Sequence, residues 1–184
     1  WREGPAGIEP APGPVVPFGP WRESAAGARR AGIWLVEGET RSEVGEGGST
    51  VAVFSRSMVL ANPEGFAPDP GPGVPWAALA GIARPGRFEK GAEALRGRAP
   101  VLAIRPGDHA RYGPRAAARI MKAMNEAGAD LLVTTGKDWV KLGDWWSGDI
   151  PVLVADLAIT WKNDRTLPDL VGERLDAWKD RAAR

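Results

Sequence analysis

Two patterns of apolar and polar residues alternate regularly from residue 76 to the end of the chain. Short apolar runs are typical of strands in a parallel sheet whose two faces are both covered. Between them lie longer segments whose apolar residues recur at the spacing of an amphipathic helix. The predicted strands are 76–80, 101–104, 131–133 and 151–161, and the predicted helices are 86–96, 114–127 and 167–181.

These helices carry boundary signals and apolar stripes. Pro114 falls where a first-turn proline belongs, and Gly128 falls where a helix would stop. Asp164 and Thr166 are candidate N-caps of the last helix. We expect each stripe to be buried: Phe88, Ala92 and Leu95 in the first helix, Ala117, Ile120, Met121 and Met124 in the second, and Leu167, Leu170, Val171, Leu175 and Trp178 in the last.

The first part of the chain is less regular. Residues 1–75 contain 24 Gly or Pro, against 17 in residues 76–184, so turns and extended segments dominate there. The expected elements are a helix at 21–30 ended by Gly32, a buried strand at 33–36, an exposed strand at 50–60 and a linker at 62–75.

The alternation of short strands and amphipathic helices predicts an α/β fold with a parallel sheet covered by helices. In such sheets, ligands bind beyond the carboxyl ends of the strands. The loops at 81–86, 105–113 and 134–138 are therefore the candidate ligand-binding segments.

Composition narrows the chemistry. The 184 residues allow one domain or two small ones, carry a net charge of +1, and include no cysteine and one histidine. Disulfides, thiolate metal sites, cysteine nucleophiles and two-histidine metal sites are excluded. The charge gives no indication of nucleic acid, and no apolar stretch reaches the roughly 18 residues that span a bilayer.

The loop GIARPGRF, at 81–88, follows one strand and opens a helix. The helix N-terminus, assisted by Arg84 and Arg87, is suited to an anion. A tight turn before a helix that begins at a proline is the simpler interpretation.

The loop RPGDHARYGP, at 105–114, holds His109 beside Asp108. A histidine next to a carboxylate in a strand-to-helix loop is able to orient a ligand or carry a proton. The alternative is a surface histidine without a task.

The segment TTGKD, at 134–138, follows the third strand. Thr134, Thr135 and Lys137 are candidate phosphate contacts. Equally, Thr135 is a candidate helix cap, with Lys137 and Asp138 in solvent.

Upstream, GPWRES places Arg22 and Glu23 in the first turn of the predicted helix at 21–30. Arg22 is suited to a phosphate or a carboxylate partner. The alternative is an ordinary helical turn, with Glu23 favourably placed against the helix dipole.

Taken in order, five segments resemble the carboxyl-terminal part of the tetraacyldisaccharide 4′-kinase (lipid A 4′-kinase) family. They are VVPFGPWRE at 15–23, RRAGIWLV at 29–36, AGIARPGRF at 80–88, DHARY at 108–112 and LVTTGKD at 132–138. Ala110 stands where the family often has a second histidine, and Gly136 where it often has glutamate.

The resemblance implies transfer of the γ-phosphate of ATP to the 4′-hydroxyl of a tetraacyldisaccharide 1-phosphate, at the cytoplasmic face of the bacterial inner membrane. It implies a three-layer, Rossmann-like small domain related to phosphate-loop NTPases, joined by a two-stranded ribbon to part of a larger α/β core. The implied domains are 1–49 for the core, 50–61 and 151–161 for the ribbon, 76–150 for the small domain and 167–184 for a helix on the core.

The family's phosphate loop and acidic Mg²⁺-binding segment are absent from these 184 residues. The resemblance therefore implies an amino-terminally truncated piece that is inactive alone. It pairs Arg22 and Glu23 with the phosphates, as catalytic residues, and His109 and Asp108 with the nucleotide. It assigns no metal ligand here, and the sequence leaves the oligomeric state open.

Two other hypotheses remain open. The first is a non-catalytic α/β module that binds a nucleotide or a lipid, which the differences at Ala110 and Gly136 favour. The second is a small Rossmann-like enzyme acting on a phosphorylated metabolite, with its ligand at the loops 81–87 and 134–138.

Overall fold

The computed structural model describes residues 2–4, 7–9, 13–15, 23–28, 30–38, 50–107, 110–147, 149–162 and 166–183. The chain divides into two compact units. One comprises Trp1–Ser57 together with Ile159–Arg184, and the other comprises Met58–Ala158.

The Met58–Ala158 unit is built on parallel strands in the order β8-β7-β5-β6. The strands are β5 (Trp76–Leu79), β6 (Leu102–Ile104), β7 (Leu131–Thr135) and β8 (Val152–Trp161), and β8 continues past Ala158 into the other unit. The connecting helices are α2 (Pro85–Arg96), α3 (Pro114–Ala127) and α4 (Gly136–Leu142), and α4 is followed by one 3-10 turn, η2 (Gly143–Trp145).

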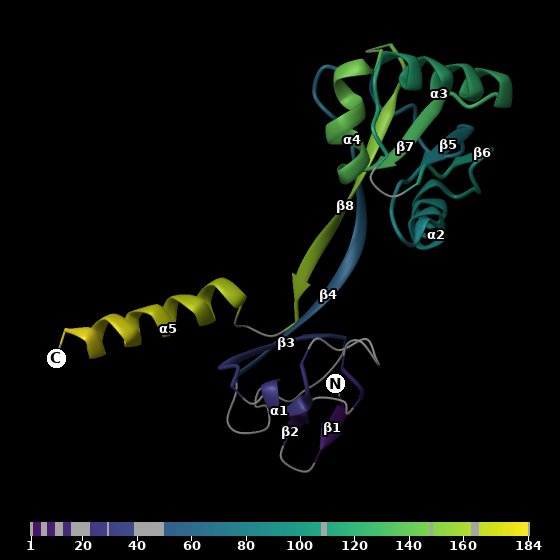
Figure 1. The fold of residues 1–184 in the computed structure, drawn as a ribbon. Coiled ribbons are helices and arrows are strands. Elements are labelled where there is room, and N and C mark those ends of the chain that lie inside the picture. Colours follow the sequence, from purple (N-terminus) through teal and green to yellow (C-terminus); the bar gives the residue numbers. More distant parts are fainter. Residues whose placement is uncertain are drawn as a thin grey trace. The chain divides into compact units, whose positions relative to one another are not determined.

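Side chains of β5 point alternately to two apolar clusters, because successive residues of a strand face opposite sides. Ala77 and Leu79 belong to the cluster that includes α3, whereas Trp76 and Ala78 belong to the cluster that includes α2. Figure 1 shows α3 and α2 on opposite sides of these strands. The predicted parallel, three-layer α/β arrangement is confirmed.

The helix boundaries follow the sequence signals. Pro85 and Pro114 are the first residues of α2 and α3, where a missing N–H costs no hydrogen bond. Gly97 and Gly128 end the two helices with φ of +73° and +66°, in the left-handed region that favours glycine.

Strand β4 (Thr50–Ala61) neighbours β8. The Lys162 backbone N–H donates to the Val53 carbonyl at 2.9 Å, and the side-chain amide of Asn62 donates to the Val152 carbonyl at 3.0 Å. The early part of one strand therefore lies beside the late part of the other, which makes the pair antiparallel. Val51–Val53 are buried, so the expectation that this strand is exposed is wrong for its first half.

In the other unit, β3 (Ile33–Glu37) pairs with β4 in parallel. Its side chains alternate, with Trp34 and Val36 buried and Leu35 exposed, so the strand is half-buried and not fully buried as predicted. The described part of this unit also contains the antiparallel pair β1 (Arg2–Gly4) and β2 (Gly7–Glu9).

Among the described residues of the predicted helix at 21–30, only those of α1 (Ala25–Ala28) are helical. Gly27 weakens a segment already too short to offset the cost of helix nucleation. Glu23 precedes the helix, and Gly32 does not cap it. Instead, the Gly32 carbonyl accepts from the Thr50 N–H at 3.0 Å and from the Arg174 guanidinium at 2.8 Å.

Two apolar stripes are not buried as expected. In α5 (Leu167–Ala182), Leu170 is buried, whereas Val171, Leu175 and Trp178 are exposed. The predicted cap Thr166 is confirmed by a capping box with Asp169, and Asp164 lies outside the described residues.

In α2, Leu95 is exposed and Arg96 is buried. The Arg96 guanidinium forms an ion pair with Asp69 at 2.9 Å and donates to the Gly71 carbonyl. The predicted linker at 62–75 is thus held against the end of α2.

Candidate functional site

Asp138, on the first turn of α4, is the point at which three strand-end segments meet. Its side chain is 1 % exposed. One carboxylate oxygen, Oδ2, accepts from the Gly81 N–H at 2.9 Å and from the Thr135 hydroxyl at 2.7 Å. The other, Oδ1, accepts from the Tyr112 hydroxyl at 2.9 Å. We call these four residues the Asp138 cluster.

The fold brings these segments together because the strands are parallel. Leu79 of β5 lies opposite Ile104 of β6 and Thr134 of β7 in the sheet register. The three strands therefore end at the same edge of the sheet. Ligands of such folds bind beyond this edge, at the carboxyl ends of the strands.

Thr135 positions Asp138 within its own segment. It is the N-cap of α4, and its hydroxyl accepts from the Asp138 N–H at 3.3 Å. The structural interpretation of TTGKD is thus confirmed for Thr135. Asp138 is buried, however, and does not lie in solvent as that interpretation expected.

Thr134 and Lys137 differ in exposure. The Thr134 side chain is buried, and its hydroxyl donates to the Leu79 carbonyl at 2.9 Å across the sheet. Lys137 is exposed in the first turn of α4. A contact of either residue with a phosphate stays a prediction.

The loop after β6 is tied down at three described points. Arg105 forms a two-point ion pair with Glu89 of α2, at 2.8 and 2.7 Å. Lys141 donates to the Ala110 carbonyl at 3.2 Å, and Tyr112 donates to Asp138. Residues of two helices thereby hold the described parts of this loop in place.

Ion pairing and burial have opposite effects on the pKa of Glu89 and of Arg105, whereas hydrogen bonding and burial act in the same direction on Tyr112. The hydrogen bond from Arg105 lowers the pKa of the Glu89 carboxyl despite its burial, and the same contact raises the pKa of Arg105. Burial raises the pKa of the Tyr112 phenol, and the hydrogen bond to Asp138 adds to the effect. Tyr112 therefore remains a protonated donor at neutral pH.

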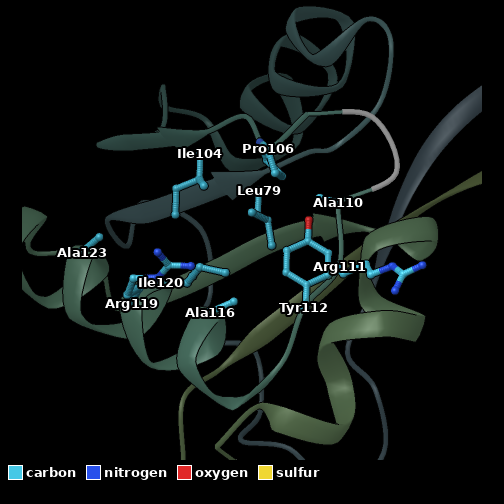
Figure 2. Close-up of a pocket in the computed structure, with 10 residues that line it drawn as sticks. All are labelled: Leu79, Ile104, Pro106, Ala110, Arg111, Tyr112, Ala116, Arg119, Ile120 and Ala123. Carbon is cyan, nitrogen blue, oxygen red and sulfur yellow. The ribbon is translucent and has the colours of Figure 1, made fainter.

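A pocket of about 310 Å³ opens beside this cluster (Figure 2). Leu79, Ile104, Ile120 and the Tyr112 ring give it an apolar lining. Arg119 also lines it, with its guanidinium pointing toward Ile104 in Figure 2. The pocket suits an apolar group that carries a negative charge.

Arg84 and Arg87 are exposed at the start of α2, with Arg84 at the N-cap. The predicted turn before a helix that begins at a proline is confirmed by Pro85. Together with Lys137, these arginines place exposed positive charge on segments that follow β5 and β7, which favours an anionic ligand at this edge.

The remaining predicted site residues are not brought to this cluster by any described contact. Glu23 lies in the other unit and pairs with Arg30 at 2.8 Å, with both side chains mostly exposed. Arg22, Asp108 and His109 lie outside the described residues.

Sequence reasoning missed Gly81 and Tyr112 as partners of Asp138. They lie 57 and 26 residues away from it along the chain. A usable signal was the strand-end rule itself, since each of the three segments follows a predicted parallel strand. Tyr112 is also the chain's single tyrosine.

The described residues contain no group of three or more His, Asp or Glu side chains arranged to hold a metal ion. Among the same residues, no helix combines the length and apolar character needed to cross a bilayer.

The fold and this edge define an α/β protein with exposed basic side chains on the segments that follow β5 and β7. Residues 10–175 match the family model described as tetraacyldisaccharide-1-P 4′-kinase. The chain belongs to this family, which is one of kinases.

Curated relatives carry the name tetraacyldisaccharide 4′-kinase. The protein from Phenylobacterium zucineum is 36% identical over 140 residues, which are 73% of this chain and 40% of the relative. That from Geobacter metallireducens is 50% identical over 68 residues, covering 36% of this chain and 19% of the relative. The chain thus spans less than half the length of these relatives.

Among solved structures, LpxK from Aquifex aeolicus, crystallised in complex with ATP, has the same fold. The TM-score is 0.56 at 22% identity, and the match covers 86% of this chain and 47% of that one.

Proposed function

We propose that the gene product containing this chain phosphorylates the 4′-hydroxyl of a tetraacyldisaccharide 1-phosphate with ATP, in lipid A biosynthesis. The family match over residues 10–175 carries this proposal. The exposed cations beside the strand ends support it, because both ATP and the lipid phosphate are anionic.

We assign the chain's regions as the resemblance does. Residues 76–150 form a small domain whose strand-end loops meet the ligand, residues 50–61 and 151–161 form the connecting ribbon, and residues 1–49 and 167–184 belong to the larger core. The division of the chain near Ser57 and Ile159 supports this assignment.

Within this scheme, Arg22 and Glu23 act on the phosphates, and His109 and Asp108 contact the nucleotide. Arg84, Arg87 and Lys137 add positive charge near the ligand. Bound Mg²⁺ would neutralise charge that develops on the transferred phosphoryl group. We assign none of the chain's residues as its ligand.

The test is an assay of phosphate transfer from ATP to the tetraacyldisaccharide by the full gene product. We expect turnover, and we expect Arg22→Ala and His109→Ala each to lower kcat/KM by about tenfold or more. Lys122→Ala is the matched control, because Lys122 is exposed on α3 and pairs only with Glu126 at 3.7 Å among the described contacts. Absence of transfer to the lipid overturns the proposal.

We also propose a peripheral position at the cytoplasmic face of the inner membrane, where a lipid substrate is accessible. Such binding is reversible and partly electrostatic. The full gene product should sediment with membranes in low salt and be released by high salt. Sedimentation that resists both salt and alkaline washing contradicts a peripheral position.

A non-catalytic binding module is the alternative, favoured by the differences at Ala110 and Gly136. The described contacts at these two positions weaken this argument, because they show no structural disruption from the two differences. Ala110 contributes its carbonyl to Lys141, which any residue supplies, and a Cβ at Gly136 would meet only Val154, at 4.0 Å. Nucleotide binding without turnover by the full gene product would favour this alternative.

A further inference from the structure

A buried carboxylate that ties three family segments together has a role beyond folding. Gly81, Tyr112 and Thr135 belong to the segments AGIARPGRF, DHARY and LVTTGKD, and each donates to Asp138. We propose that Asp138 is a positioning residue for phosphoryl transfer, which holds the loops after β5 and β6 in one arrangement and does not itself touch ATP or the lipid. This inference rests on the function proposed above.

Stability alone does not explain the choice of a carboxylate at position 138. Burying an ionised carboxyl is costly, and its hydrogen bonds only offset that cost. An apolar side chain of similar size often serves a core equally well. The three donors of Asp138 are neutral and come from three separate segments, so what the carboxylate adds is a fixed geometry between them.

The Gly81 end of this arrangement depends on close approach. A Cβ at position 81 would lie 2.8 Å from Oδ1 of Asp138 and 3.4 Å from Cγ of Pro106. Glycine is therefore required for the backbone N–H to reach the carboxylate. Gly81 leads directly into the turn that carries Arg84 and the start of α2.

At the other end, α4 holds the loop after β6 at two points. Asp138 accepts from Tyr112, and Lys141, one helical turn later, donates to the Ala110 carbonyl. Movement of Asp138 would release Tyr112 and leave the loop with the Lys141 contact and the Arg105–Glu89 ion pair.

Asparagine separates positioning from direct chemistry. In Asp138→Asn, the amide oxygen still accepts from Gly81 and Thr135, and the amide nitrogen donates to the Tyr112 oxygen once its hydroxyl turns. A residue that takes a proton or binds a metal would lose its role in this variant. A positioning residue would keep most of its role.

The experiment measures kcat and KM for ATP and for the lipid in the full gene product. We expect Asp138→Ala to raise KM or lower kcat by about tenfold or more, and Asp138→Asn to change either by less than about threefold. Gly81→Ala and Tyr112→Phe should change the same parameter. Combining Tyr112→Phe with Asp138→Ala should add little, because the two residues share one interaction.

Asp130→Ala is the matched control. Asp130 is exposed at the opposite, amino end of β7, and should leave both parameters unchanged. Circular dichroism and thermal unfolding report the folded fraction of each variant. A purely structural role would lower the folded fraction and leave both KM and the kcat per folded molecule unaltered, and that result overturns the inference.

Amide hydrogen exchange provides a readout that does not depend on turnover. In folded Asp138→Ala, residues 81–84 and 110–113 should exchange faster than in the wild type. Unchanged exchange overturns the positioning role even if the enzyme is active. If the wild type is inactive but the variant exchanges faster, the proposed function is overturned, whereas the conclusion that Asp138 holds the two loops is retained.

Discussion

Titration of the Tyr112 phenol should make the free energy of unfolding depend on alkaline pH. Burial and the bond to Asp138 raise its pKa above the ordinary value of about 10. The folded chain therefore keeps this proton at pH values where the unfolded chain has lost it. Its contribution is complete below about pH 10, and the free energy of unfolding should fall as pH rises beyond that.

Urea unfolding on either side of about pH 10 measures this fall. Tyr112→Phe should remove the part of the fall that comes from the phenol. Because the chain has one tyrosine, tyrosinate absorbance reports its titration directly. A folded protein whose phenol titrates at the ordinary value would contradict the prediction.

Arg96 should contribute more to stability than its exposed neighbour. Its side chain is 4 % exposed and pairs with Asp69, which is 40 % exposed. Among the described groups, its Nε has no hydrogen-bond partner. Arg96→Met keeps the apolar stem and removes the bonds to Asp69 and Gly71, and should lower the free energy of unfolding by about 1–3 kcal/mol.

Urea denaturation checks the Arg96 prediction. Leu95→Ala is the control, because Leu95 is 48 % exposed on the same turn, and its change should stay within about 0.5 kcal/mol. Faster proteolysis within residues 62–75 should accompany the loss of Arg96. Equal effects of the two substitutions would contradict the structural role of the ion pair.

At the scale of one helix, Gly136 and Gly128 should respond oppositely to alanine. Gly136 opens α4 with no left-handed φ, and a Cβ there would make only ordinary van der Waals contact, with Val154 at 4.0 Å, so Gly136→Ala should stabilise by about 0.4–1 kcal/mol. Gly128 has a φ of +66°, which strains any side chain, so Gly128→Ala should destabilise by about 1 kcal/mol. Thermal unfolding of both variants measures the difference in sign.

Local signals explain which elements were predictable. Helices bounded by proline and glycine, such as α3, and short apolar strands, such as β7, are predicted by signals that lie within a few residues of each other. The predictions from sequence are wrong where residues far apart in the chain determine which side chain is buried. Leu95 and Arg96 both continue the spacing of Phe88 and Ala92, and the ion pair with Asp69 selects Arg96 for burial.

The candidate site also has a part that local signals predict and a part that contacts between distant residues determine. The strand-end rule gave the three segments, because it follows from the parallel order of the strands. The convergence on Asp138 joins positions far apart in the chain, and no local pattern encodes which side chain reaches which.

At the scale of the whole molecule, some elements are fully buried and others are exposed. Local opening of the structure should be rarer in the buried elements. All four residues of β5 are buried, as are the first four of β7, and the two strands pair directly. Such segments open only with the unit as a whole, whereas exposed elements open locally. In native-state hydrogen exchange we expect β5 and β7 to exchange slowest among the described segments.

Two helices of similar length make the comparison decisive. In α3, three residues along one face are buried, whereas in α5 only Leu170 is. Helical hydrogen bonds are equally available in both, so a difference in exchange isolates the contribution of packing. In these 184 residues, α5 should exchange much faster than α3. Equal protection would mean that Val171, Leu175 and Trp178 are covered in solution, because hydrogen bonds alone do not protect a helix whose apolar face is exposed to water.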